Sequence, residues 1–302
     1  MRIVVAIGGN ALLRRGERPD AAPQRRHVAA AAAALAGVVR EHEVVVVHGN
    51  GPQVGLLALE SGADPSLSEP YPLSDLVAES QGLIGLWLQQ ALLDEGIGDV
   101  VTLVSQTVVD PDDPAFQAPT KFIGQVYDEA TAAGLADRYG WTVRADGDGW
   151  RRVVASPVPR AIVELPVAER LLAAGVTVVL AGGGGVPVVD GDVGYDSVDA
   201  VVDKDRAAAL AAEALGADLL LVLTDVEGVI RDFGGPAEKV LREVSVAELS
   251  AMQFPAGSMG PKVDAVCAFT RRTGRRSAIG SLEEINGVLA GTSGTQVRSR
   301  AR

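Results

Sequence analysis

The chain has 302 residues with 27 basic and 39 acidic side chains, which gives a formal net charge of −12. An acidic chain gains nothing from counterion release on a phosphate backbone, and nucleic acid is therefore not expected as its main partner. With 47% hydrophobic residues, 22% charged residues and 35 glycines, the composition excludes disorder across the whole chain and is typical of a globular protein rich in turns.

One cysteine, Cys267, is present, so the chain cannot form an internal disulfide. That usage suits a reducing compartment, and we expect a cytoplasmic protein. Free cysteines are usually buried as small hydrophobes, and this role is favoured for Cys267 over that of a nucleophile. No apolar run approaches the roughly 18 residues that a membrane helix needs, and no membrane partner is expected.

Short β-branched runs alternate with longer helix-like segments, an order typical of a mainly parallel sheet covered by helices. Strands are predicted at Arg2–Ile7, Glu43–Val47, Val100–Val104, Val176–Ala181 and Leu219–Leu223. Helices are predicted at about His27–Arg40, Ser74–Glu95, Val163–Ala174, Asp205–Leu215 and Pro261–Arg272. Pro261 fits the first position of its helix, and either Asp203 or Asp205 could cap the helix before it.

The alternation breaks between about Asp110 and Ser156, where prolines and a Gly/Asp-rich stretch interrupt the pattern. This segment carries Tyr127, Trp141 and Trp150, aromatic residues that can anchor a small core. We therefore predict an inserted subdomain or lid here, not a linker.

Glycine clusters follow three of the predicted strands: Gly8-Gly9-Asn10, Gly49-Asn50-Gly51 and Gly182–Gly185. In an open parallel sheet, ligands bind outside the carboxyl ends of the strands, so the three clusters are expected to meet at one crevice. Glycine lets the backbone approach a ligand closely, and its N–H groups attract anionic oxygens. The sequence thus predicts an anion site.

Familiar catalytic motifs are absent. No lysine completes a P-loop, no glycine cluster completes the dinucleotide fingerprint, and no Gly-x-Ser-x-Gly elbow occurs. The three histidines lack the spacing of a metal site, and no protein metal ligand is predicted. His48, beside the second glycine cluster, fits either a hydrogen-bonded structural role or a ligand contact.

Positive charge is carried by 23 arginines and only four lysines. Lys121, Lys204 and Lys262 each lie in a predicted turn or helix start, whereas Lys239 lies in a polar stretch typical of a solvated surface. Phosphoryl transfer needs positioned cations on the phosphate oxygens, which such lysines would supply. For Asp203-Lys204-Asp205, a purely structural ion pair is an equally open interpretation.

Taken in order along the chain, these motifs resemble the carbamate kinases of the amino-acid kinase family. The resemblance rests on segments 6–12, 48–55, 80–90, 119–127, 149–157, 182–187, 203–205 and 257–262. It implies a three-layer α/β/α sandwich with a mainly parallel central sheet and a protruding lid. It also implies an acceptor lobe at 1–217 with the lid insert at 111–156, and a nucleotide lobe at 218–302.

The activity implied by the resemblance is reversible phosphoryl transfer between ATP and carbamate, giving ADP and carbamoyl phosphate, with Mg²⁺ bound through the nucleotide. It further implies a homodimer, and a reaction that proceeds toward ATP synthesis in the catabolism of arginine or related nitrogen compounds. Two other readings stay open: a kinase of another small acid or phosphonate, and a non-catalytic sensor of nucleotide or carbamoyl phosphate.

Roles carried over from the family fall into three groups. Phosphate stabilisation and its organisation are implied for Lys121, Lys204, Asp205 and Lys262. Binding of carbamate and the transferred phosphoryl group is implied for Gly8, Gly9, Asn10, Gly49, Asn50, Gly51, Gly183 and Gly184. Nucleotide contacts are implied for Lys204, Thr224, Asp225, Val226, Gly257, Ser258, Met259, Gly260 and Lys262. Phe122 and Gln125 stand where the family commonly has proline, which predicts a differently shaped lid loop.

Overall fold

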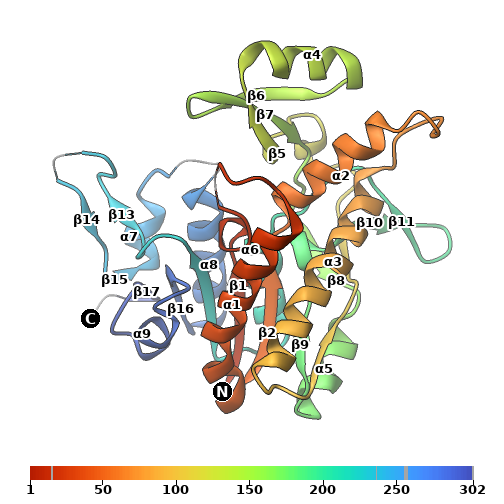
Figure 1. Ribbon diagram of the computed structural model, residues 1–302. Helices are drawn as coiled ribbons and strands as arrows, with labels where there is room; N and C mark the ends of the chain where they lie inside the picture. Colours follow the sequence, from red (N-terminus) through yellow and green to blue (C-terminus); the bar gives the residue numbers. More distant parts are fainter. Residues whose placement is uncertain (15, 236, 255–257, 301–302) are drawn as a thin grey trace.

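The computed structural model describes residues 1–14, 16–235, 237–254 and 258–300 (Figure 1). Its centre is an eight-stranded sheet in the order β15-β17-β16-β12-β1-β2-β9-β3. These strands span Glu243–Ser245 (β15), Thr295–Arg298 (β17), Arg276–Ser281 (β16), Leu219–Thr224 (β12), Arg2–Ile7 (β1), Glu43–His48 (β2), Thr177–Val179 (β9) and Val100–Thr102 (β3). Neighbouring strands are parallel except for β16 and β17, so the sheet is mainly parallel, as predicted.

Helices cover both faces of this sheet and complete the predicted three-layer α/β/α sandwich (Figure 1). One face packs against Ala21–Glu41 (α1), Leu73–Asp94 (α3) and Ile285–Ala290 (α9). The other packs against Leu165–Ala173 (α5), Lys204–Ala214 (α6), Val246–Ser250 (α7) and Met259–Thr273 (α8). Within the part of the chain that the structure describes, no helix is long and apolar enough to cross a membrane.

Apolar side chains on the central strands divide between the two faces. On β1, Val4 and Ala6 enter one core cluster, whereas Ile3, Val5 and Ile7 enter the other, and all five are fully buried. Successive side chains of a strand point to opposite faces, and a strand covered on both sides must therefore be apolar throughout. This requirement explains the unbroken apolar runs in the sequence.

Smaller elements surround the sandwich. A four-stranded sheet, β11-β10-β4-β8, packs with Gly51–Ala63 (α2) and α3 around a third core cluster. Its strands are Tyr195–Ser197 (β11), Val186–Asp190 (β10), Gln106–Val109 (β4) and Pro159–Ile162 (β8). Three short 3₁₀ turns lie at Gly9–Ala11 (η1), Pro114–Phe116 (η2) and Gly182–Gly184 (η3), and a two-stranded ribbon joins Ile230–Arg231 (β13) to Lys239–Val240 (β14).

A separate three-stranded antiparallel sheet projects from the molecule beyond α2 (Figure 1). It consists of Lys121–Tyr127 (β5), Thr142–Asp146 (β6) and Gly149–Val154 (β7), with Glu129–Tyr139 (α4) packed on it. We call these four elements the lid; they lie within the segment predicted as an insert. Phe122 and Gln125 both lie in β5, whose pairing with β7 is irregular between Ile123 and Tyr127.

The core of the lid differs from the prediction. Ala132 and Val153 are buried, and Ile123 and Val154 are buried in the third core cluster with α2 and α3. The predicted anchors Tyr127, Trp141 and Trp150 are only partly buried. The three rings therefore lie at the margin of the lid. Trp141 is held there between Tyr139, 5.2 Å away by ring centroids, and the guanidinium of Arg152, 4.5 Å from its ring.

Most predicted helix and strand boundaries move by a turn or less, but α1 begins at Ala21, six residues before the predicted start at His27. Three corrections have a physical cause. Helix α2 was not predicted, because Pro52 and three glycines resemble a loop, yet the first turn of a helix needs no N–H from proline. Pro261 is the third residue of α8, not the first. The strand expected to reach Ala181 ends at Val179, and Ala181 has a φ of 49°, which is incompatible with a strand.

Candidate active site

A cavity of about 560 Å³ opens at the carboxyl ends of β1, β2 and β12. We call it the central pocket. Of the residues predicted to bind ligand, it is lined by Gly8, Gly9, Gly49, Asn50, Gly51, Lys121, Gly183, Lys204, Asp205, Thr224, Asp225, Val226, Ser258, Met259 and Lys262. The structure thus brings glycines, lysines and helix starts from distant parts of the chain to one place, as expected for a parallel sheet.

Close backbone approach explains two of the glycines. A Cβ on Gly49 would lie 2.9 Å from the backbone nitrogen of Gly9, so a side chain there would push the first two glycine turns apart. Gly183 has a φ of 65°, in the left-handed region that favours glycine, and a Cβ on it would lie 2.2 Å from Cγ of Asn50. The second and third glycine turns therefore depend on glycine at these positions to reach the pocket wall.

Three lysines and two aspartates form a charged cluster in the central pocket. The Lys121 ammonium from the lid pairs with Asp203, and Lys204 pairs with Asp205. Lys262, on α8, reaches the other oxygen of Asp205 at 3.1 Å. Asp203 also caps α6, because its Oδ1 accepts hydrogen bonds from the backbone N–H groups of Asp205 and Arg206 at 2.9 and 3.2 Å. Asp203 is thus the cap, whereas Asp205 lies inside the helix.

Burial and charge act against each other in this cluster. Burial favours a neutral acid, but Lys121 and Lys204 outweigh it and hold the pKa of Asp203 well below its usual range. Lys204 and Lys262 lower the pKa of Asp205 in the same way. For Lys204, burial disfavours the ammonium more than Asp205 stabilises it, and its pKa falls to about 8. The less buried Lys262 keeps a pKa above its usual value, because Asp205 outweighs burial.

The far end of the central pocket is more apolar. Thr224 at the end of β12 donates its hydroxyl to Asp225 at 3.0 Å, and the wall continues through Ile230, Phe233 and Phe254. None of these three apolar residues was assigned a role from the sequence. The sequence did contain a hint for Phe233, because it is one of only five phenylalanines and lies in a Gly/Asp-rich turn, where an apolar side chain is unusual. In the structure it is 78% exposed.

Arg151 was also assigned no role from the sequence. It comes from β7 of the lid and lines the central pocket, and its Nε donates to the carbonyl of Gly124 at 2.9 Å. Nothing local distinguishes it from Arg152, which stacks on Trp141 instead, because alternation along the strand sends the two side chains to opposite faces.

Four predicted residues need separate mention. Gly184 does not line the central pocket; its carbonyl accepts the Thr107 hydroxyl at 2.7 Å, and its role is packing against β4. Gly260 lines a neighbouring cavity instead. Gly257 lies outside the described residues, as does the side chain of Asn10.

Two open interpretations can be decided from burial. His48 is fully buried, does not line the central pocket, and has a ring nitrogen 3.1 Å from the carbonyl of Gly49, which supports the structural role. Burial lowers the pKa of His48 to about 4, so the ring is neutral at pH 7. Cys267 is buried in the sandwich core, where burial raises the pKa of its thiol, as expected for a small hydrophobe.

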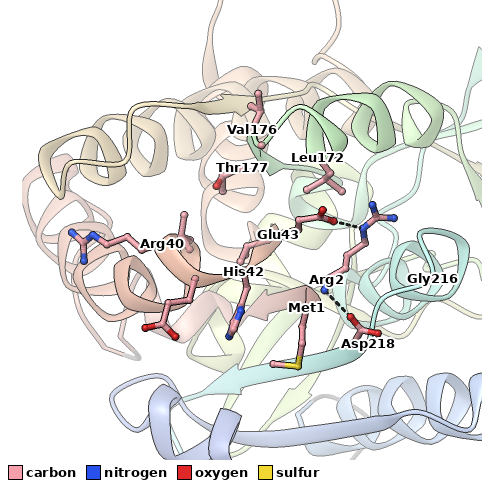
Figure 2. A pocket seen from close by; sticks show the side chains of 14 residues that line it. Met1, Arg2, Arg40, His42, Glu43, Leu172, Val176, Thr177, Gly216 and Asp218 are labelled. Carbon is pink, nitrogen blue, oxygen red and sulfur yellow. Dashed lines mark hydrogen bonds and ion pairs between the residues drawn. The ribbon is translucent and has the colours of Figure 1, made fainter.

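A second cavity of about 570 Å³ lies at the opposite, amino ends of the strands (Figure 2). Arg2 holds two of its carboxylates: the side chain reaches Glu43 at 2.9 Å, and the backbone nitrogen donates to Asp218 at 2.8 Å (Figure 2). Ligands of parallel sheets bind at the carboxyl ends, and none of the described residues that line this cavity is a lysine. The central pocket is therefore the candidate active site.

Comparison with known proteins identifies the family of this chain. Residues 1–281 match the amino acid kinase family. A carbamate kinase of Rhizobium meliloti (strain 1021) is 46% identical, with 99% of this chain and 94% of the relative covered. Among solved structures, carbamate kinase from Giardia lamblia bound to citric acid has a TM-score of 0.93 at 39% identity, with 98% of each chain covered. The same enzyme bound to AMP-PNP has a TM-score of 0.87 at 40% identity, again with 98% of each chain covered.

Proposed function

The chain belongs to the amino acid kinase family and, within it, to the carbamate kinases, and from that premise we propose that it transfers a phosphoryl group reversibly between ATP and carbamate. The products are ADP and carbamoyl phosphate. The observation that carries the proposal is the cluster of Lys121, Lys204 and Lys262 opposite three glycine turns. Cations and backbone N–H groups that face each other suit a phosphoryl group in transit between two oxygens.

The acidic residues of the cluster favour a carboxylate acceptor over an alcohol. An alcohol must lose a proton as it attacks phosphorus, so a nearby base assists it. Asp203 and Asp205 are poor bases, because both accept from lysine ammonium groups that hold their pKa low. The oxygen of carbamate is already anionic at neutral pH and attacks without a base. A site with strong cations and weak bases therefore suits an acid as acceptor.

Each lysine would meet a different part of the reacting groups. Lys121 arrives from the lid, Lys204 from the start of α6, and Lys262 from α8. Three ammonium groups from separate elements can surround the phosphoryl group as charge spreads over its oxygens. Asp205 holds two of them together, and Asp203 holds the third against the cap of α6. We assign both aspartates a positioning role.

The nucleotide is proposed to occupy the more apolar end of the central pocket. Thr224, Asp225 and Val226 follow β12 there, and Ile230 with Phe254 offers an apolar surface suited to a purine ring. Ser258 and Met259 at the start of α8 would approach the phosphates, since a helix N-terminus favours anions. The AMP-PNP complex of the Giardia enzyme supports a nucleotide in this fold.

Magnesium is proposed to enter with the nucleotide. Among the residues that the structure describes, no three His, Cys, Asp or Glu side chains lie together in a way that could hold a metal ion. Mg²⁺ commonly keeps its waters and binds substrate phosphates with few protein ligands. When bound, it would neutralise phosphate charge beside the lysines. At the nucleotide end of the pocket, Asp225 carries a carboxylate, the kind of group that Mg²⁺ takes as a protein ligand.

From the same family membership we propose a cytoplasmic homodimer. We also propose that its reaction proceeds toward ATP synthesis in the catabolism of arginine or related nitrogen compounds. Light scattering on the purified chain measures the oligomer. The two lobes, at 1–217 and 218–302, are proposed to carry acceptor and nucleotide, with the insert at 111–156, which contains the lid, closing over both.

The test is ATP formation from ADP, Mg²⁺ and carbamoyl phosphate by the wild type and three lysine variants. Lys121→Ala and Lys204→Ala should each lose at least about a hundredfold in kcat, as expected when one electrostatic stabiliser of the transition state is removed. Lys239→Ala is the matched control, because Lys239 is exposed on β14 and does not line the central pocket. A folded wild type that binds nucleotide but makes no ATP would favour another small acid or phosphonate as substrate, or a sensor.

A further inference from the structure

Asn50 is the one side-chain amide among the described residues that line the central pocket. It lies between Gly49 and Gly51 at the start of α2, and it is 2% exposed. The surrounding groups are mostly donors: lysine ammonium groups and backbone N–H groups. A side chain that can offer either an N–H or a carbonyl oxygen is therefore informative, and its orientation matters.

A hydrogen-bond chain fixes that orientation. The Ser80 hydroxyl donates to the carbonyl of Val77, one turn earlier in α3, at 2.8 Å. A serine has one proton to donate, so Ser80 can only accept from its other neighbour. That neighbour is the Nδ2 of Asn50, at 2.8 Å. The amide nitrogen must therefore point toward α3, and the amide oxygen must point away from it.

Packing keeps the amide in this position. A Cβ on Gly183 would lie 2.1 Å from Nδ2, 2.2 Å from Cγ and 2.5 Å from Oδ1 of Asn50, so the η3 turn lies directly against the amide. Ser80 is fully buried behind it. No hydrogen bond between described residues uses Oδ1 of Asn50. The oxygen is thus an unused acceptor beside Gly183, which lines the same pocket.

We propose that Ser80 positions Asn50 so that its Oδ1 accepts an N–H from the amino group of the acceptor substrate. A carbonyl oxygen repels the oxygens of a carboxylate and attracts an N–H, so it distinguishes the two ends of carbamate. An acid with a methyl group in place of the amino group gains nothing from it. The inference rests on the proposed function and deepens it: Asn50 selects the amino group, and Ser80 sets the amide orientation.

Two phosphoryl donors test the selection in the direction of ATP formation. Carbamoyl phosphate carries the amino group, and acetyl phosphate replaces it with a methyl group of similar size. The measured quantity is the ratio of kcat/KM for the two donors, with ADP and Mg²⁺ fixed. Ser80→Ala leaves the Asn50 nitrogen without its partner and frees the amide to turn, and the ratio should fall about tenfold. Asn50→Leu, of similar volume, removes the acceptor and should lower the ratio as much.

Ser277→Ala is the matched control. Ser277 on β16 is also fully buried, and its hydroxyl contacts Thr270 at 2.7 Å and the Val266 carbonyl at 3.1 Å, away from the central pocket. Its ratio should stay at the wild-type value even if its stability falls. An unchanged ratio in Ser80→Ala or in Asn50→Leu, or an equal loss with both donors, overturns the inference. A wild type that makes no ATP from carbamoyl phosphate overturns the proposed function, and the inference with it.

Discussion

Replacing Asp205 by asparagine tests whether this carboxylate keeps the lysines charged. Asp205 is 2% exposed and accepts from both Lys204 and Lys262. Asp205→Asn keeps the shape of the side chain and removes its charge. Burial already lowers the pKa of Lys204 to about 8, and Asp205 is the largest influence that opposes this fall. In the variant the pKa of Lys204 should fall below 8, and the lysine should be partly neutral at pH 7.

The magnitude follows from the burial of the pair. Removing one partner of a buried ion pair costs about 3–5 kcal/mol, because the remaining charge is left uncompensated. Lys204 can avoid part of this cost by releasing its proton, and more so at high pH. When the pKa of a lysine is lower in the folded state than in the unfolded state, the unfolded state binds more protons between these two pKa values. The free energy of unfolding therefore rises with pH over that range. The loss should be about 3–5 kcal/mol at pH 6.5 and at least about 1 kcal/mol smaller at pH 9.

Denaturant unfolding at both pH values measures this difference, and ATP formation across pH measures its functional counterpart. Activity of Asp205→Asn should decline at a lower pH than that of the wild type, because Lys204 loses its proton earlier. Asp264→Asn is the control: Asp264 is exposed and lies 3.7 Å from Arg206, a surface pair worth at most about 1 kcal/mol. An equal destabilisation of Asp205→Asn at pH 6.5 and pH 9 would refute the reasoning.

Two further predictions concern packing and acid stability. Gly55→Ala should destabilise the fold by about 1–3 kcal/mol or more and impair activity, because a Cβ there would lie 2.0 Å from Cα of Gly124 in the lid. Gly82→Ala, with nothing within 4 Å, should instead stabilise α3 by up to about 1 kcal/mol; thermal unfolding compares the two. His48 stays neutral when folded, so its contribution is present above pH 6.5 and lost as pH falls through its pKa of about 4. His48→Gln should therefore lose less stability than the wild type between pH 6.5 and 4, by up to about 3 kcal/mol, in unfolding titrations.

Sequence patterns predicted five of the eight strands of the central sheet, β1, β2, β3, β9 and β12, because these strands carry their own signal. The other three, β15, β16 and β17, were not predicted. β1 matches its predicted bounds, β12 ends one residue later than predicted, and α3 begins and ends one residue earlier. The apolar runs of these strands satisfy both faces of the sheet at once, which leaves little freedom in assignment. The sequence offered Asp203 and Asp205 as alternative caps of α6, since aspartate is favoured there, and the structure selects Asp203.

Elements whose signal is not local were missed or left open. Helix α2 contains Pro52 and three glycines, and its glycines serve contacts with other parts of the chain: Gly55 meets the lid, and Gly62 meets Tyr139. Such glycines weaken the helical pattern for the sake of close packing elsewhere. Sequence spacing alone does not reveal the partner that demands them.

The candidate site shows the same division. Glycine turns and lysines were identifiable by residue type, and the parallel sheet explains why they converge. The pairing of Lys121 with Asp203 joins residues 82 positions apart, and the resemblance had assigned the organising role to Asp205 alone. Arg151 and Phe254 line the central pocket only because the lid and the segment before α8 fold toward it, and no local sequence pattern indicates this.

The balance of charge in the central pocket explains how three lysines can share it. Ammonium groups repel one another, and burial removes their protons, as the lowered pKa of Lys204 shows. Two carboxylates oppose both effects. Asp203 is fixed by its role as the cap of α6 and by Lys121, and Asp205 is fixed by Lys204 and Lys262, so neither carboxylate needs much further ordering when substrate binds. A polyphosphate with several negative charges then meets cations that are already ordered, and its own charge would raise the pKa of Lys204. The two aspartates therefore preorganise the positive charge that phosphoryl transfer requires.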